Sequence, residues 1–185
     1  MAEGRTGSVV GATGAIYAMR AALFTTLPSA VILDDVYQPM AIVRQGYRIA
    51  MAPRALAFDR PSKDHAAEYR RRVRTLVGNL ELVRLMPWLL SPVRNPIWLR
   101  YVSHKLLRVL IPVLCVGMVV SGLFLPGVGY QGVVAVLLLG YLLGALGLVA
   151  PIRVLALPSA FLLLHTAGFA ALLRPARRAS DVWAS

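Results

Sequence analysis

The amino-acid sequence predicts a polar α/β domain, mostly helical with a few strands, followed by an α-helical membrane region of two to three transmembrane helices. Three observations support this division. The 185-residue chain is 58% hydrophobic, more than soluble globular domains contain. Sixteen of its twenty Lys and Arg residues and seven of its eight Asp and Glu residues precede Val109. No charged residue lies between Val109 and Ile152, a length that holds two membrane crossings of about 20 residues each.

The polar part begins with a glycine-rich segment, residues 4–14. Glycines allow the backbone to approach a ligand or a neighbouring element closely, but this segment has neither the lysine of a phosphate-binding loop nor a dinucleotide fingerprint. Residues Tyr17–Leu27 predict a short helix that Pro28 ends. The three apolar residues Val31–Leu33 then predict a buried strand.

Two adjacent carboxylates, Asp34 and Asp35, follow this predicted strand directly. An acid at the end of a strand, facing a cleft, is a common position for a general base. The alternative is structural, because Asp is a favoured helix N-cap and Gln38, three residues after Asp35, fits a capping box. A helix is predicted from Val36 to Gln45, with Gly46 as its C-terminal stop.

A second strand is predicted at Arg48–Ala52, where apolar and polar residues alternate weakly. A long helix is predicted over Tyr69–Leu85, because apolar residues recur there at spacings of three and four. These residues are Tyr69, Val73, Leu76, Val77, Leu80 and Val83.

The first turns of this long helix carry four arginines: Arg70, Arg71, Arg72 and Arg74. They repel one another and lie near the positive end of the helix dipole. A bound phosphate would compensate, because guanidinium groups grip phosphate with paired hydrogen bonds. Contact with anionic membrane lipid is the alternative, and the sequence leaves both open.

Residues 85–108 combine tryptophans with basic residues, which is typical of segments at the bilayer interface. His104, just before the membrane, has either a catalytic or an interfacial role. The crossings are predicted at about 109–126, 132–150 and 154–173, before a tail at 175–185. The excess of Lys and Arg before residue 109 predicts a multi-pass protein of the cell membrane with its polar part in the cytoplasm. Three full crossings would export the basic tail, so a re-entrant or interfacial third segment remains an alternative.

Five segments together resemble the C-terminal half of membrane-anchored family 2 glycosyltransferases, which are similar to cellulose, hyaluronan and poly-N-acetylglucosamine synthases. They are GATGAIYAMRAALF (11–24), ILDDV (32–36), RQGYR (44–48), EYRRRVRTLVGN (68–79) and SHKLLR (103–108). The resemblance covers about residues 7–110 and implies that residues 1–84 are the C-terminal part of a glycosyltransferase-A-type catalytic domain.

The resemblance assigns roles by position. Asp34 and Asp35 stand where the family has its acid pair, and Asp35 matches the general base. Arg71 and Thr75 stand where a Gln-x-x-Arg-Trp motif has its glutamine and tryptophan, and Arg74 matches its arginine. Loss of that tryptophan argues against a long-chain processive polymerase. With Arg72, these arginines are implied to bind the departing diphosphate. Residues 11–20, with Thr13 and Gly14, match the segment that lines the acceptor side of the site.

The implied reaction is inverting transfer of a sugar from a nucleotide-sugar donor to a saccharide or lipid-linked acceptor. It implies a divalent cation, Mg²⁺ or Mn²⁺, whose ligands lie mostly outside this chain. The family's donor-binding half, with its Asp-x-Asp motif, has no counterpart in this sequence. Three explanations remain open: the chain is a truncated reading of a longer gene, the donor half is on a separate polypeptide, or the protein is a non-catalytic remnant. In each case we expect no sugar transfer by the isolated chain. The alternative function is a non-catalytic membrane subunit that binds anionic lipid or a partner protein through the basic helix. The sequence has no nucleic-acid recognition motif.

Overall fold

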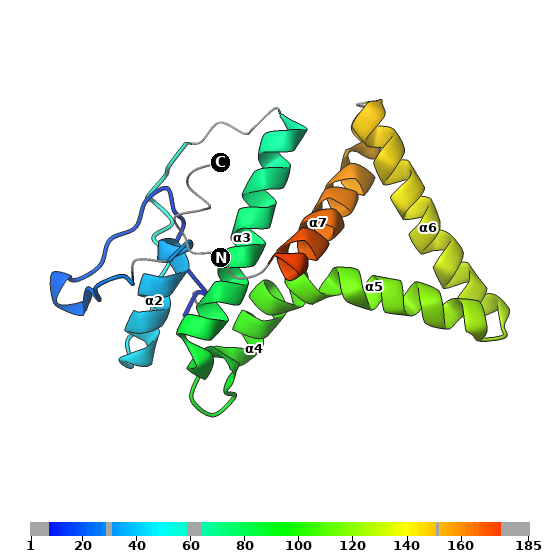
Figure 1. Ribbon diagram of the computed structural model, residues 1–185. Helices are drawn as coiled ribbons and strands as arrows, with labels where there is room; N and C mark the ends of the chain where they lie inside the picture. Colours follow the sequence, from blue (N-terminus) through cyan, green and yellow to red (C-terminus); the bar gives the residue numbers. More distant parts are fainter. Residues whose placement is uncertain (1–7, 29–30, 59–63, 151, 175–185) are drawn as a thin grey trace. The chain divides into compact units, whose positions relative to one another are not determined.

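Figure 1 shows the computed structural model of the chain, in which residues 8–28, 31–58, 64–150 and 152–174 are described. Every regular element in these ranges is helical. The α-helices are α2 (Asp34–Arg44), α3 (His65–Leu85), α4 (Trp98–Tyr101), α5 (Leu107–Phe124), α6 (Val128–Val149) and α7 (Ala156–Leu173). Short stretches of other helix types are η1 (Ala21–Leu23), η2 (Pro87–Leu90), the π-helical η3 (Val102–Leu106) and η4 (Arg153–Leu155).

The predicted α/β fold, a partial glycosyltransferase-A-type domain, is therefore wrong for the described residues, which contain no strand. At Val31–Leu33 the prediction of burial is right for Ile32 and Leu33, but the backbone groups bond elsewhere. The Ile32 N–H donates to the Glu81 carboxylate (3.1 Å), and the Leu33 carbonyl accepts from the Tyr37 N–H (2.9 Å) as α2 begins. In a strand these backbone groups would form hydrogen bonds with a neighbouring strand. A run of three apolar residues does not distinguish a buried strand from a buried segment that leads into a helix.

Two further sequence predictions fail for a similar reason. Residues 48–52 form no strand, although Ile49 pairs with the start of the described chain: its carbonyl accepts from the Val9 N–H (3.3 Å) and its N–H donates to the Ser8 hydroxyl (2.9 Å). Of the predicted helix Tyr17–Leu27 only η1 forms, and none of its residues is buried. A short helix without a packed face lacks the tertiary contacts that stabilise most helices in proteins.

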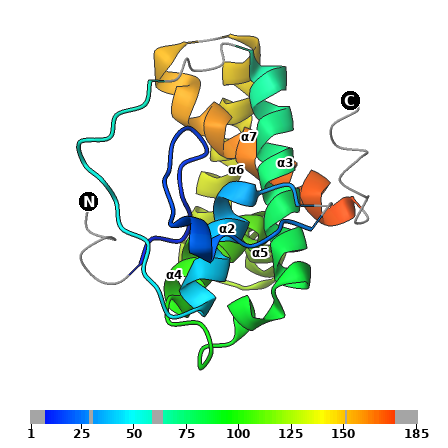
Figure 2. The same cartoon turned by 90° about the vertical axis from the view of Figure 1, so that its left-hand side faces the viewer.

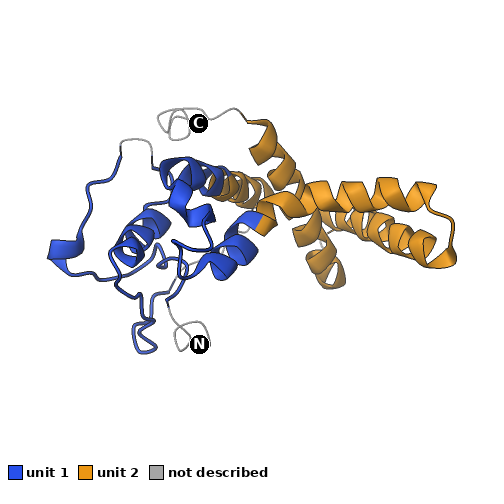
Figure 3. Ribbon diagram, turned by 90° about the horizontal axis from the view of Figure 1, so that it is seen from below, with its two compact units in different colours: residues 1–61, 77–106, 176–185 blue, residues 62–76, 107–175 orange. Residues whose placement is uncertain are grey.

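The chain divides into two compact units, coloured separately in Figure 3. Unit 1 comprises residues 1–61, 77–106 and 176–185, and unit 2 comprises residues 62–76 and 107–175. Helix α3 contributes its residues up to Leu76 to unit 2 and the remainder to unit 1.

The core of unit 1 forms around α2 and the second half of α3. Its fully buried members include Met40, Leu82, Leu89 and Tyr101. Gly78 permits the closest contact, because a Cβ added there would lie 2.6 Å from Leu33 Cγ. The absence of a side chain on α3 thus lets the residues that precede α2 pack directly against it.

Helix α2 contains a proline whose missing N–H is replaced from elsewhere in the chain. Pro39 cannot donate to the carbonyl of Asp35, four residues earlier. The Ala12 N–H donates to that carbonyl instead (2.8 Å), which holds the glycine-rich segment at the first turn of α2. In Figure 2 the dark blue start of the described chain runs in front of α2. The helix ends as predicted: Gly46 has a φ of 87°, and its N–H and that of Tyr47 bond back to the last turn.

The predicted long helix is confirmed as α3, but it begins four residues earlier, at His65. Asp64 provides the start, because its carboxylate accepts hydrogen bonds from the N–H groups of Ala66 (3.0 Å) and Ala67 (3.1 Å). These two bonds hold the pKa of the Asp64 carboxyl below its usual value. The spacing pattern correctly places Val73 on the buried side, together with Leu76.

The apolar helices α5, α6 and α7 belong to unit 2. Among the described residues, three helical stretches are long and apolar enough to cross a membrane: Trp98–Phe124, which begins in unit 1, Val128–Val149 and Arg153–Leu173. The prediction of a membrane region with up to three transmembrane helices is confirmed at this level of length and composition. The first stretch begins earlier than predicted, because α4 and the π-helical η3 continue into α5.

Glycines mark the contacts between the three helices of unit 2. Gly122 near the end of α5 lies against Val134 of α6, Gly144 of α6 lies against Pro158 of α7, and Gly168 of α7 lies against Pro112 of α5. Small residues at such positions let membrane helices approach closely. As Figure 1 shows, α5 and α6 meet at one end, and α7 joins their other ends.

Candidate functional site

The acid pair lies in the first turn of α2, not at the end of a strand. Asp34 is exposed and Asp35 is half-buried. Gly14 lies over Asp35, since a Cβ added to this glycine would be 3.4 Å from Asp35 Oδ2. Thr13 shapes the same loop by donating its hydroxyl to the Ile16 carbonyl (3.1 Å). The structure thus brings together four of the predicted site residues in unit 1.

Tyr17 belongs to the same group and was not anticipated as a site residue. Partial burial, then the charges of Asp34 and Asp35, raise the pKa of its hydroxyl. The hydroxyl is protonated at neutral pH and can donate a hydrogen bond. The residue is 41% exposed, so a ligand can reach it. Nothing in the local sequence pattern identifies it, because its proximity to the acids depends on how the loop folds over α2.

The capping-box alternative for the acid pair is wrong. The N-cap of α2 is Leu33, with no side-chain cap bond. Gln38 is fully buried and pairs with the backbone of Thr25 instead, accepting from its N–H (3.2 Å) and donating to its carbonyl. What remains of the structural explanation is a favourable interaction of two negative charges with the positive end of the α2 dipole.

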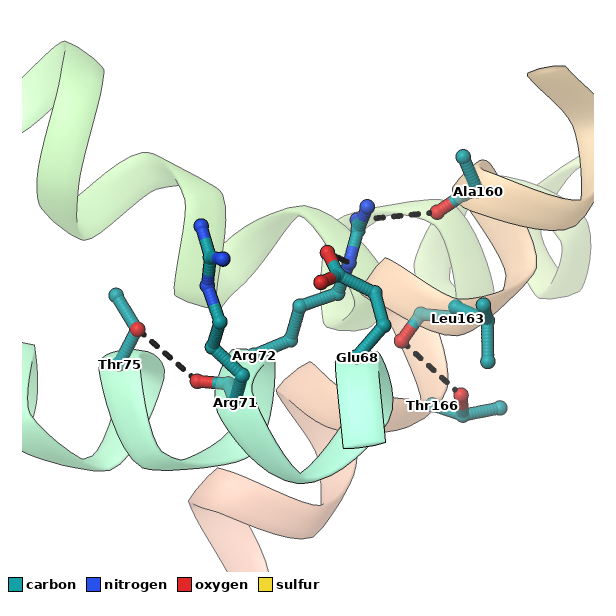
Figure 4. Close-up of polar contacts among 7 residues, drawn as sticks. All are labelled: Glu68, Arg71, Arg72, Thr75, Ala160, Leu163 and Thr166. Carbon is teal, nitrogen blue, oxygen red and sulfur yellow. Dashed lines mark hydrogen bonds and ion pairs between the residues drawn. The ribbon is translucent and has the colours of Figure 1, made fainter. Parts of the chain in front are cut away.

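The three predicted arginines lie in the first turns of α3, in unit 2, and they differ from one another. Arg71 and Arg74 are exposed, whereas Arg72 is half-buried. Arg72 donates from Nε to Glu68 (2.9 Å) and from Nη1 to the Ala160 carbonyl on α7 (3.4 Å). In Figure 4 the side chains of Arg71 and Arg72 leave the helix in different directions. The arginines therefore do not form one uniform anion-binding cluster.

Other candidates have simpler positions. His104 is exposed in the π-helical stretch η3, and π-helical turns occur often at functional sites. Trp88, predicted at the membrane interface, is buried in the core of unit 1, with the Arg44 guanidinium 5.9 Å from its ring centroid.

The described residues do not supply a site for the divalent cation that the family resemblance implies. They contain no group of three or more His, Cys, Asp or Glu side chains that could hold a metal ion. Asp34 and Asp35 alone are too few for a metal site built from protein ligands.

The arrangement around α2 has the components for proton transfer to and from hydroxyl groups. A carboxylate, Asp35, is half-buried beside the Gly14 backbone, and the charges of Asp34 and Asp35 help to raise the pKa of the Tyr17 hydroxyl. Carboxylates accept protons from bound hydroxyls, and tyrosines both stack on sugar faces and donate to their oxygens. Comparisons of the chain with protein-family models, with curated proteins and with solved structures find no match.

Proposed function

We propose that this chain is the acceptor side of a membrane-bound inverting glycosyltransferase, in which Asp35 is the general base. The observation that carries the proposal is the grouping of Asp35, Asp34, Thr13 and Gly14 at the start of α2, four residues that the family resemblance also assigns to one site. This grouping involves two segments separated by about twenty residues in the sequence.

In the proposed reaction, Asp35 takes the proton of an acceptor hydroxyl while its oxygen attacks the anomeric carbon of a nucleotide-activated sugar. The new bond joins the acceptor oxygen to that carbon, the bond to the diphosphate breaks, and the configuration inverts. A positioned base of this kind contributes about 10²–10⁴ to the rate. Of the three arginines that the resemblance assigns to the departing diphosphate, Arg71 and Arg74 are exposed, whereas Arg72 bonds to Glu68 and Ala160.

We further propose a cytoplasmic location for the polar part, where nucleotide sugars are made. Lys and Arg residues precede α5, as the positive-inside rule requires for a cytoplasmic flank. If α5 and α6 each cross the bilayer, the start of α5 and the end of α6 lie on that same side. Helix α7 contacts both of these ends, through Gly168 and Gly144, so its own two ends also lie there. These contacts support an interfacial or re-entrant α7, and we propose on this basis that the basic tail is cytoplasmic.

The acid pair offers its own matched control. Asp34→Asn and Asp35→Asn remove the same charge from the same helix turn, so loss of the dipole interaction affects both variants similarly. The assay is transfer from labelled nucleotide sugars by the chain reconstituted in membranes with a polypeptide that supplies an Asp-x-Asp donor half. We expect Asp35→Asn to lower turnover by about 10²–10⁴ and Asp34→Asn to lower it far less. Equal activity of Asp35→Asn and wild type would show that Asp35 is not the base.

A further inference from the structure

Unit 2 contains a cavity of about 330 Å³ that the proposed sugar transfer does not use. It lies between the first turns of α3 and the start of α7. The polar part of its wall consists of the titratable residues His65, Glu68, Arg72 and Arg153 together with the Ser159 hydroxyl. Its volume is at the lower end of the range for small-molecule pockets, which suits a headgroup-sized ligand.

Arg72 is held in place for a ligand by its neighbours. The bond from Nε to Glu68 and the bond from Nη1 to the Ala160 carbonyl fix the plane of the guanidinium. Figure 4 shows this side chain extending from α3 to α7. These two contacts use two of the five N–H donors of the guanidinium, and the others remain for an anion in the cavity. A fixed guanidinium loses little conformational entropy when it binds.

The second cation, Arg153, lies in η4 between α6 and α7 and is exposed. Together, Arg72 and Arg153 carry two positive charges and Glu68 carries one negative charge, so the cavity wall has a net charge of about +1 with His65 neutral. A monoanion balances this charge. A phosphodiester carries one negative charge and presents the oxygens that arginines bind best.

The remaining wall is apolar and belongs to the membrane-length helices. Ile152, Ala156 and Leu163 line it, and the stretch Arg153–Leu173 to which two of them belong is long and apolar enough for a bilayer. A cavity that joins two arginines to such a surface offers a place to a charged headgroup and to the apolar start of an acyl chain.

We propose that this cavity binds the phosphodiester headgroup of an anionic membrane lipid, with Arg72 and Arg153 as its cationic ligands. The proposal makes specific the lipid-binding alternative that the basic helix raised. The proposal gives Arg72 a role that the neighbouring arginines do not share, because Arg71 and Arg74 do not line the cavity. It does not depend on Asp35, so lipid binding and sugar transfer fail or succeed independently.

The test is native mass spectrometry of the full chain in detergent, titrated with phosphatidylglycerol or with phosphatidylcholine. Arg153→Gln is the principal variant, because the Arg153 side chain makes no hydrogen bond or ion pair with the described residues, and the backbone bond of its carbonyl in η4 does not depend on the side chain. Arg71→Gln is the matched control: it removes one exposed arginine next to Arg72 that does not line the cavity. We expect Arg153→Gln to weaken phosphatidylglycerol binding about fivefold, equivalent to about 1 kcal/mol, and Arg71→Gln to leave it unchanged.

Three outcomes would overturn the proposal. Wild-type affinity of Arg153→Gln would show that the cavity is not the site, and an equal loss in Arg71→Gln would indicate diffuse attraction to a basic surface. Complete displacement of the lipid by millimolar glycerol phosphate, with no added affinity from the acyl chains, would identify the ligand as a soluble phosphate. Arg72→Gln gives an independent check, with circular dichroism to confirm that the helices persist after loss of its contacts with Glu68 and Ala160.

Discussion

The contact between α6 and α7 at Gly147 is predicted to tolerate no side chain. A Cβ added to Gly147 would lie 2.7 Å from Leu155 Cβ and 2.9 Å from the Leu155 carbonyl oxygen, and it would also meet the Ser159 hydroxyl. Ordinary contacts between carbon atoms are about 3.5–4.0 Å, so the two helices must separate by about 1 Å to accept Gly147→Ala. Because the nearest obstacles include backbone atoms and a Cβ, a change of rotamer does not relieve the clash.

The expected size of the effect combines two opposing contributions. Overpacking a close contact costs about 1–3 kcal/mol. Alanine in a helix interior is favoured over glycine by about 0.5–1 kcal/mol. Gly147→Ala should therefore lower the free energy of unfolding by up to about 2.5 kcal/mol, which corresponds to a Tm lower by up to about 10 °C in a chain of this size.

Gly140→Ala is the matched control, because it lies in the same helix and no atom lies within 4 Å of its added Cβ. This variant should gain only the helix preference and raise the Tm by about 1–4 °C. Thermal unfolding of both variants in one detergent, followed by circular dichroism at a helix band, measures the difference. A Gly147→Ala variant as stable as Gly140→Ala would refute the close contact between α6 and α7.

Three other predictions concern different parts of the chain. Gly78→Ala should destabilise unit 1 by about 1–3 kcal/mol and speed hydrogen exchange in α2, because its Cβ would lie 2.6 Å from Leu33 Cγ. Burial raises the pKa of Glu81 above its usual 4.5, so its contribution to stability is full below about pH 4.5 and is lost as the pH rises through the folded-state value. Glu81→Gln, which keeps an oxygen for the Ile32 N–H, should therefore raise the Tm at pH 7 and leave it unchanged at pH 3.5. In a Cys115→Ser background, a cysteine at Ser180 should be labelled by an impermeant reagent only after the membrane is opened, whereas labelling of intact cells would place the tail outside.

The membrane helices were predictable because their signal is local. A run of uncharged apolar residues identifies a membrane-length helix without knowledge of its neighbours. The buried side of α3 was predictable for the same reason, since Val73 and Leu76 follow the helical repeat. The start of the first membrane-length stretch at Trp98 was missed because Arg100, Lys105 and Arg108 interrupt its apolar pattern, although the backbone remains helical.

The strands were wrongly predicted because their signal depends on partners. Leu33 is buried against Gly78, forty-five residues later, and the Ile32 N–H bonds to a side chain of α3. A short apolar run reports only that it is buried, and the identity of the covering element decides whether it is extended or enters a helix. The bond from Ala12 to the Asp35 carbonyl is equally non-local, as is the position of Tyr17 near the acids.

The two explanations of the acid pair are compatible, and the structure shows where they separate. The positive end of the α2 dipole favours negative charge on both Asp34 and Asp35, and a general base must carry that charge to accept a proton. A stabilising role in the helix turn is thus also a preparation for base catalysis. The difference between the residues lies in their surroundings: Asp34 is exposed, whereas the Asp35 carboxylate is half-buried against Gly14 and its carbonyl is bonded to Ala12. Under the proposal that Asp35 is the general base, a Gly14 variant that moves the loop should lower turnover in the reconstituted transfer assay and leave the thermal stability of the helices unchanged.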